Sequence, residues 1–333
     1  MTEPIDRNLA LELVRVTEAA AVQAARWMGR GRKEDSDQAA VDAMRSVLNS
    51  IAMSGLVVIG EGEKDEAPML YVGELLGTGD HPQVDIAVDP IDGTRLLANG
   101  MPNSVAVIAV AERGSMMASD DVMYMDKIAV GSRAAGRIHI DRSVAENLRE
   151  VGAALGKAMD DITVVVLDRP RHEQLIADIR AVGSRIKLIT DGDVAGAIMA
   201  ASDETSVDLM LGVGGAPEAV IAACALKCLG GDMQARLWPR NDEEREKVRV
   251  KQIDTSRIFG LDDLVAGENC FFAATGITDG ELLRGVHYLG GGGATTESLV
   301  MRSRTGTVRR IQATHRVDKM SSMWPGSVDL ASD

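Results

Sequence analysis

The chain has 333 residues, and its 36 Lys and Arg against 50 Asp and Glu give a net charge of −14 at pH 7. That acidity, the lack of a long Lys/Arg run and an aromatic content of only 3% exclude a nucleic-acid binder that relies on a basic, base-stacking surface. Three cysteines without CxxC spacing, no apolar leader and no apolar run of about 18 residues predict a cytoplasmic protein that does not enter a membrane.

The first elements are two helices and two buried strands. Apolar residues at helical spacing predict helices over about residues 6–28 and 36–55. Short apolar runs at residues 56–59 and 84–88 predict strands. Each predicted strand is followed by an acidic loop, so carboxylates are delivered at two strand ends.

The next elements suggest a change of architecture along the chain. Strands predicted at residues 105–111, 122–130 and 137–140 have no long helices between them, which favours antiparallel pairing. From residue 143 to residue 229 helices and strands alternate, which favours a parallel sheet with right-handed crossovers. A charged helix or loop is expected at residues 241–257, and the last strands are predicted at residues 270–274, 298–302 and 307–313.

The two acidic loops hold the clearest candidates for chemistry. Six carboxylates occur there: Glu61, Glu63, Asp65, Glu66, Asp89 and Asp92. Such a cluster repels itself unless a cation is bound, and oxygen ligands without His or Cys suit Mg²⁺, Mn²⁺ or Ca²⁺. In the second loop, Pro90 stiffens the turn, Gly93 permits a close backbone approach and Thr94 adds a hydroxyl. This set suits metal-assisted attack on a phosphate, the alternative being solvated loops.

Later strand ends offer groups that could bind a sugar phosphate. Arg169 and Arg171 flank a proline and suit bidentate phosphate binding, although they could also form an exposed basic loop. Asp191 and Asp193 could bind sugar hydroxyls or cap the following helix. Glu218 could complement a helix dipole or bind a metal.

Taken together, these segments resemble the class II fructose-1,6-bisphosphatases of the GlpX type. The segments are Gly60-Glu-Gly-Glu-Lys-Asp-Glu-Ala-Pro68, Asp89-Pro-Ile-Asp-Gly-Thr94, Arg169-Pro-Arg-His172, Asp191-Gly-Asp193 and Gly214-Gly-Ala-Pro-Glu218. The likeness runs from residue 7 to residue 312. The Asp89–Thr94 element alone is similar to the wider lithium-sensitive, metal-dependent sugar phosphatase and inositol monophosphatase superfamily.

The resemblance implies a layered αβαβα sugar-phosphatase fold of the α/β class. An antiparallel-rich N-terminal domain, residues 1–145, would bind the metals, and a mainly parallel C-terminal domain, residues 146–333, would bind the sugar phosphate. The implied reaction is metal-dependent hydrolysis of fructose 1,6-bisphosphate to fructose 6-phosphate in gluconeogenesis, with Mn²⁺ or Mg²⁺. The implied assembly is a homodimer or homotetramer. Alternatives are an enzyme that also acts on sedoheptulose 1,7-bisphosphate, and a non-catalytic sugar-phosphate sensor.

The resemblance also implies roles for individual residues. The implied metal ligands are Asp37, Glu61, Asp89, Asp92 and Glu218, with Asp35 as an alternative to Asp37. The implied catalytic residues are Thr94, Glu63 and Asp65. The implied substrate contacts are Asp92, Gly93, Thr94, Tyr124, Arg169, Pro170, Arg171, Asp191, Gly192, Asp193 and Gly215.

Overall fold

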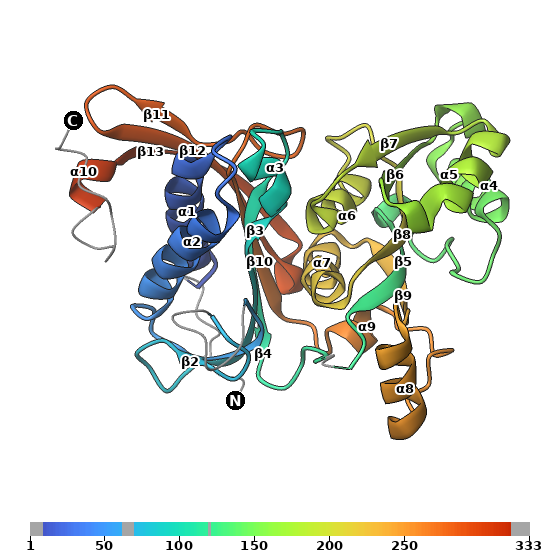
Figure 1. Ribbon diagram of the computed structural model, residues 1–333, viewed down its shortest axis with the longest axis horizontal. Helices are drawn as coiled ribbons and strands as arrows, with labels where there is room; N and C mark the ends of the chain where they lie inside the picture. The colour runs from blue at the N-terminus through green and yellow to red at the C-terminus, as the bar shows by residue number, and fades with distance from the viewer. Residues whose placement is uncertain (1–8, 62–69, 119–120, 321–333) are drawn as a thin grey trace. The chain divides into compact units, whose positions relative to one another are not determined.

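The computed structural model describes residues 9–61, 70–118 and 121–320, and shows a mixed α/β protein with two mixed sheets (Figure 1). The chain divides into two compact units. Unit 1 combines residues 1–115 with residues 269–333, and unit 2 is residues 116–268. This division differs from the single boundary expected near residue 145, because the last strands return to pair with the first sheet.

Unit 1 contains an eight-stranded sheet in the order β11-β12-β10-β4-β3-β1-β2, with β13 also paired to β12. The strands are β1 (Ser54–Ile59), β2 (Leu75–Leu76), β3 (Gln83–Asp92), β4 (Val105–Glu112), β10 (Cys270–Gly276), β11 (His287–Leu289), β12 (Gly293–Arg302) and β13 (Thr307–Arg316). Within the described residues, β1 and β3 pair in parallel and the other pairs of this sheet are antiparallel. The expected antiparallel-rich character is confirmed for this sheet.

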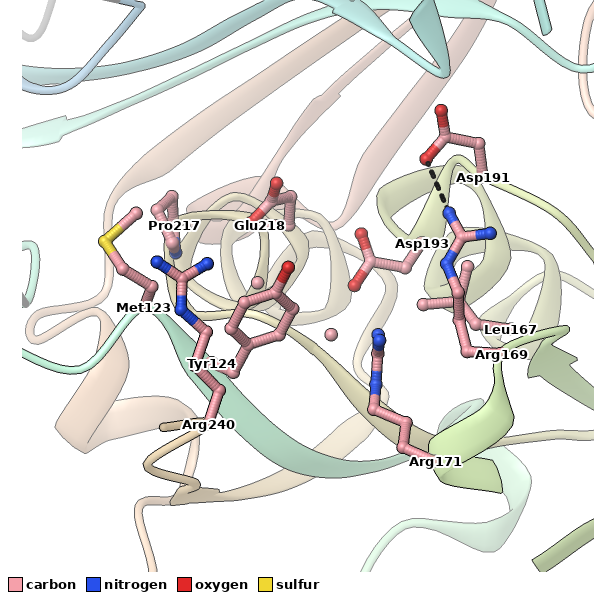
Figure 2. A pocket seen from close by; sticks show the side chains of 12 residues that line it. Met123, Tyr124, Leu167, Arg169, Arg171, Asp191, Asp193, Pro217, Glu218 and Arg240 are labelled. Carbon is pink, nitrogen blue, oxygen red and sulfur yellow. Dashed lines mark ion pairs between the residues drawn. The ribbon is translucent and has the colours of Figure 1, made fainter. Parts of the chain in front are cut away.

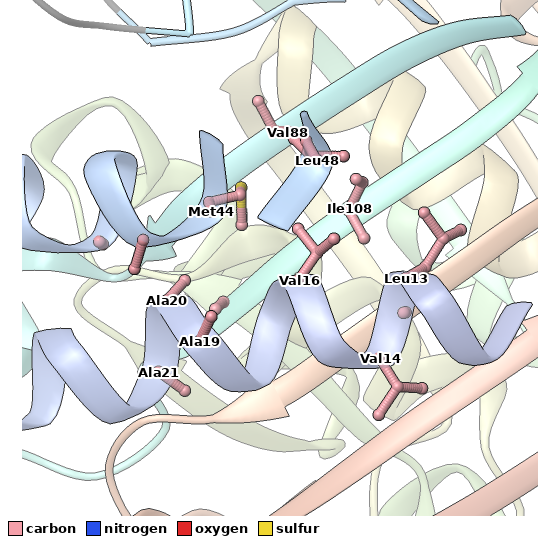
Figure 3. Packing of buried hydrophobic residues seen from close by; sticks show 14 of the residues in the cluster. Leu13, Val14, Val16, Ala19, Ala20, Ala21, Met44, Leu48, Val88 and Ile108 are labelled. Atoms are coloured by element: carbon pink, nitrogen blue, oxygen red, sulfur yellow. The ribbon is translucent and has the colours of Figure 1, made fainter. Parts of the chain in front are cut away.

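Two long helices cover this sheet. They are α1 (Leu9–Ala24), which continues into a 3₁₀ turn, and α2 (Lys33–Leu48). Helix α1 is buried on nearly all sides, and Figure 3 shows its Leu13 and Val16 among side chains of α2 and the sheet, including Met44 and Ile108. The small residues 19–21 of α1 are fully buried and let the elements packed around the helix approach it closely. The two short helices of unit 1 are α3 (Thr94–Ala98) and α10 (Val317–Met320).

Unit 2 contains a five-stranded sheet in the order β7-β6-β8-β5-β9. The strands are β5 (Tyr124–Val130), β6 (Thr163–Leu167), β7 (Arg185–Ile189), β8 (Leu209–Gly215) and β9 (Asp232–Leu237). The strands β7, β6 and β8 are parallel, as the alternating pattern predicts, whereas β5 and β9 run antiparallel to their neighbours. Strand β5, expected with the N-terminal strands, therefore belongs to the second sheet.

The first four helices of unit 2 connect these strands, and the last two follow β9. They are α4 (Val144–Leu155), α5 (Glu173–Val182), α6 (Asp193–Ala201), α7 (Ala216–Leu229), α8 (Asp242–Lys251) and α9 (Leu261–Leu264). The strand predicted at residues 137–140 is wrong. That segment is a loop, because Ile140 N–H donates to the side chain of Gln234 and His139 N–H donates to Asn147 instead of to a neighbouring strand. No helix among the described residues is long and apolar enough to cross a membrane.

Candidate functional site

The described part of unit 2 contains a cavity of about 200 Å³ (Figure 2). It is lined by Met123, Tyr124, Leu167, Arg169, Arg171, Asp191, Asp193, Gly214, Gly215, Pro217, Glu218 and Arg240. Seven of these residues are implied by the family resemblance: Tyr124, Arg169, Arg171, Asp191, Asp193, Gly215 and Glu218. The parallel strands end at one edge of the sheet, and β5 begins there because Tyr124 pairs with Gly215 across the antiparallel ladder.

Two arginines enter the cavity from the loop after β6. The guanidinium of Arg169 forms an ion pair with Asp191, 3.7 Å away on the loop after β7. Arg171 donates two N–H groups to the carbonyl oxygen of Val213, at 2.7 and 3.1 Å, and lies over the ring of Tyr124. Burial lowers the pKa of Arg171 from its usual value. An arginine held in this way presents its remaining N–H groups in a fixed direction.

A third arginine on the cavity wall, Arg240, was not among the residues predicted from the sequence. Arg240 lies 5.5 Å from the centroid of the Tyr124 ring, and Figure 2 shows the guanidinium groups of Arg171 and Arg240 on either side of that ring. Arg240 also pairs with Glu244, at 2.9 Å. The sequence did hold a signal for Arg240. Residues 232–237 alternate between polar and apolar residues, as expected of strand β9, and Arg240 follows the end of that strand.

His172 supports the loop after β6 that carries Arg169 and Arg171. Its Nδ1 lies 2.7 Å from the carbonyl oxygen of Leu167, and its Nε2 accepts a hydrogen bond from Val213 N–H at 2.7 Å. These two partners require the neutral ring with its proton on Nδ1. Burial lowers the pKa of His172, which favours the same neutral form. A side chain at Gly212 would strike this ring, since a Cβ there would lie 2.9 Å from Nε2.

The last two residues of β8, Gly214 and Gly215, lie close to two carboxylates. A Cβ at Gly214 would lie 1.9 Å from the carboxylate of Asp193, and one at Gly215 would lie 1.6 Å from that of Glu218. The two glycines therefore let these carboxylates come close to the backbone, and a larger residue at either position would displace them. The other two residues expected at these loops, Pro170 and Gly192, do not line the cavity; Pro170 begins a 3₁₀ turn and Gly192, at φ 82°, precedes α6.

Unit 1 brings together part of the predicted acidic set. Asp37 lies on α2, is half-buried and hydrogen-bonds with Thr94, and its pKa is raised to about 6, chiefly by burial. Burial also raises the pKa of Glu61, and the negative charge of Asp37 adds to the effect. Asp35 instead accepts two N–H groups of Arg32, at 2.6 and 2.9 Å. Asp37 thus lies with Glu61 and Thr94, whereas Asp35 is engaged within its own helix turn.

The second acidic loop begins inside strand β3. Pro90 cannot donate to the ladder, and the register with β4 shifts between Asp89 and Asp92. This irregularity changes the direction of the backbone at the end of β3. Asp89 Oδ1 accepts the N–H of Ile91 at 3.0 Å, Asp92 is buried, and Gly93 at φ 94° leads into α3.

The donor set of unit 1 fits a hard divalent cation. Asp37 and Glu61 are partly buried oxygen ligands whose negative charges disfavour each other, and a bound Mn²⁺ or Mg²⁺ would remove that conflict. Within residues 9–61, 70–118 and 121–320, no three His, Cys, Asp or Glu side chains form a complete metal-binding group. The predicted catalytic residues Glu63 and Asp65 lie outside the described residues.

Comparison with known proteins identifies the family. Residues 7–315 match the family described as "Bacterial fructose-1,6-bisphosphatase, glpX-encoded". The chain belongs to this family. Its relatives include "Fructose-1,6-bisphosphatase 1 class 2" of Escherichia coli (strain K12), which is 46% identical over 326 residues that cover 94% of this chain and 96% of the relative. "Fructose-1,6-bisphosphatase class 2" of Escherichia coli O6:H1 and that of Shigella flexneri match with the same identity and coverage.

Membership of the glpX-encoded bisphosphatase family confirms the resemblance drawn from the motifs. It covers both units, since the matched range begins before α1 and ends within β13. The family is one of metal-dependent sugar bisphosphatases, which agrees with the oxygen-rich donors of unit 1 and the arginine-lined cavity of unit 2.

Proposed function

We propose that this chain hydrolyses the 1-phosphate of fructose 1,6-bisphosphate, giving fructose 6-phosphate and inorganic phosphate, as a cytoplasmic enzyme of gluconeogenesis. The observation that carries the proposal is the cavity of unit 2, in which three arginines and three carboxylates surround a space of about 200 Å³. Guanidinium groups bind phosphate and carboxylates accept the hydroxyl groups of a sugar, so this lining suits a sugar phosphate. The family membership supplies the substrate class.

The residues of the cavity divide between the two parts of such a ligand. Arg169 and Arg171 bind a phosphate group, and Tyr124 holds the guanidinium of Arg171 against its ring. Asp191 and Asp193 accept hydrogen bonds from sugar hydroxyls. The backbone at Gly215 approaches the sugar closely because no side chain intervenes. Pro170 and Gly192 act through the shape of their loops, by fixing the backbone around these side chains.

The acidic residues would hold the metal ions. Asp37 and Glu61 would bind one ion. Asp89 and Asp92 are the candidate ligands of a second ion in unit 1, and Glu218 is the candidate metal ligand in unit 2. When bound, Mn²⁺ or Mg²⁺ supplies a Lewis acid for the phosphate and lowers the pKa of a water molecule. The hydroxyl of Thr94, which lies 3.2 Å from the carbonyl oxygen of Ile91 and hydrogen-bonds with Asp37, orients the attacking water. Glu63 and Asp65 assist Thr94, and the backbone of Gly93 lets the substrate approach.

The proposal is tested by measuring inorganic phosphate release. Fructose 1,6-bisphosphate, sedoheptulose 1,7-bisphosphate and inositol 1-phosphate are each supplied with Mn²⁺, with Mg²⁺ or with a chelator. We expect release from fructose 1,6-bisphosphate that the chelator abolishes. Release that persists in chelator would contradict the metal assignment, and release from inositol 1-phosphate alone would contradict the substrate assignment. The oligomer, proposed as a homodimer or homotetramer, is tested by light scattering on the same preparation.

A further inference from the structure

Lys127 is a buried cation beside the cavity that the resemblance does not assign to the site. It lies on β5 and is only 2% exposed. Its Nζ is 2.5 Å from Oδ2 of Asp193, and it donates to the carbonyl oxygen of Gly215 at 3.0 Å. Lysines are almost never fully buried unless they are paired. One ammonium group therefore joins three segments of unit 2, namely β5, the first residue of α6 and the turn before α7.

The residues around the Lys127–Asp193 ion pair leave room for it in the interior of unit 2. A Cβ at Gly214 would lie 1.9 Å from Asp193 Oδ2 and 2.8 Å from Lys127 Nζ, so a larger residue there would displace the pair from its present position. On its face of β5, the neighbours of Lys127 are Met125 and Ala129, which are apolar and fully buried. An apolar side chain at position 127 would fill this interior without the cost of dehydrating an ammonium group.

We propose that Lys127 is a positioning residue for sugar binding. The Gly215 carbonyl oxygen fixes the ammonium group, and the ammonium group holds Oδ2 of Asp193. The second oxygen of Asp193 is thereby directed to the cavity that this residue lines, as an ionised acceptor for a sugar hydroxyl (Figure 2). This inference rests on the proposed function, because it gives Asp193 its role in binding the sugar.

Lys127 acts through Asp193 and has no contact of its own with the sugar. Without the ammonium group, Asp193 would be a buried carboxylate without this cation, and it would rotate toward solvent or toward another donor. Either response removes an oriented acceptor from the cavity. The effect falls on binding of the sugar part and leaves the groups that act on the 1-phosphate, in unit 1, unchanged.

The matched control is another Lys–Asp pair in the same unit. Lys157 Nζ lies 2.6 Å from Asp208, on a part of unit 2 that does not line the cavity. Four variants are compared with the unaltered enzyme: Lys127→Met, Asp193→Asn, the double variant of both, and Lys157→Met. Each metal-loaded protein is assayed for KM and kcat with fructose 1,6-bisphosphate and titrated with fructose 6-phosphate by calorimetry, after a thermal unfolding scan.

We expect Lys127→Met to raise KM and weaken fructose 6-phosphate binding by about 10- to 100-fold, the usual loss when a group that orients a functional side chain is removed. The value of kcat should change much less, and Lys157→Met should match the unaltered enzyme. The double variant should bind as weakly as Asp193→Asn alone, because Lys127 works only through Asp193.

Two results would overturn the inference. One is binding by Lys127→Met as tight as that by Lys157→Met. The other is a double variant whose loss is the product of the two single losses. If Lys127→Met does not fold, the comparison of the double variant with Asp193→Asn decides, since the double variant carries neither buried charge and Asp193→Asn keeps an amide oxygen beside the ammonium group of Lys127. Lack of phosphate release by the unaltered enzyme would refute the proposed function instead, and the titration with fructose 6-phosphate would still test Lys127.

Discussion

The guanidinium of Arg171 lies 5.1 Å from the centroid of the Tyr124 ring while two of its N–H groups hold the carbonyl oxygen of Val213. A lysine cannot reproduce this arrangement, because its ammonium group has no planar fork and stacks less well on a ring. We therefore expect Arg171→Lys to raise KM for fructose 1,6-bisphosphate by about tenfold or more, as charged hydrogen bonds contribute about 1.5–3 kcal/mol. Steady-state kinetics measure the change.

The control for that variant is Arg245→Lys. Arg245 is exposed on α8 and pairs with Asp242 of its own helix, so its replacement should leave KM within a factor of about two. An equal rise of KM in both variants would show that Arg171 has no special part in binding.

Asp37→Asn and Asp35→Asn distinguish the two candidate ligands on α2. Asp37 lies with Glu61 and Thr94, whereas Asp35 pairs with Arg32. We expect Asp37→Asn to raise the Mn²⁺ concentration for half-maximal phosphate release by at least about tenfold, the scale of a lost charged ligand. Asp35→Asn should change it by less than about threefold, since its exposed pair contributes little. The reverse order in a metal titration would assign the site to Asp35.

Glu18 should make stability depend on pH. It is buried in unit 1 beside Thr296 and His315, and burial raises its pKa to about 7. Between pH 4.5 and 7 the unfolded chain loses this proton while the folded chain keeps it, so the free energy of unfolding falls as pH rises through this window. The loss approaches about 3 kcal/mol for a shift of this size.

Urea unfolding at pH 5 and pH 8 tests this expectation. Glu18→Gln should be the more stable protein at pH 8 and should show a smaller decrease between the two pH values. The comparison isolates Glu18, because the buried His315 and the other titrating groups remain in both proteins. A decrease of equal size in both would mean that Glu18 stays ionised throughout.

Helix α1 offers a test of the core of unit 1. Leu13 is fully buried against α2 and the sheet (Figure 3), whereas Leu11 on the same helix is 49% exposed. Leu13→Ala should lower the free energy of unfolding by about 2–5 kcal/mol, through lost burial and the cavity left behind. Leu11→Ala should change it by about 0.5 kcal/mol or less. Urea midpoints of the two variants, compared with the unaltered chain, measure the difference.

The sequence by itself determined the local elements and the chemistry of the loops. Helical spacing in residues 9–24 and the alternation of helices and strands after residue 143 depend on neighbours a few positions apart, so they can be seen in the chain. The acidic loop after β3 and the arginine loop after β6 were found for the same reason, because strand ends in an α/β protein carry ligand-binding groups. The motifs in these loops were sufficient to identify the family.

The tertiary structure alone decided which distant segments meet. Strand β10 pairs with β4 across more than 150 residues, which makes unit 1 discontinuous, and this pairing depends on complementary buried faces that no local period encodes. The antiparallel register of β5 with β8 sets Tyr124 opposite Gly215. The same strand delivers Lys127 to Asp193, 66 positions away. A buried charge within a strand has no sequence signature, because its partner is defined only when the chain has folded around it.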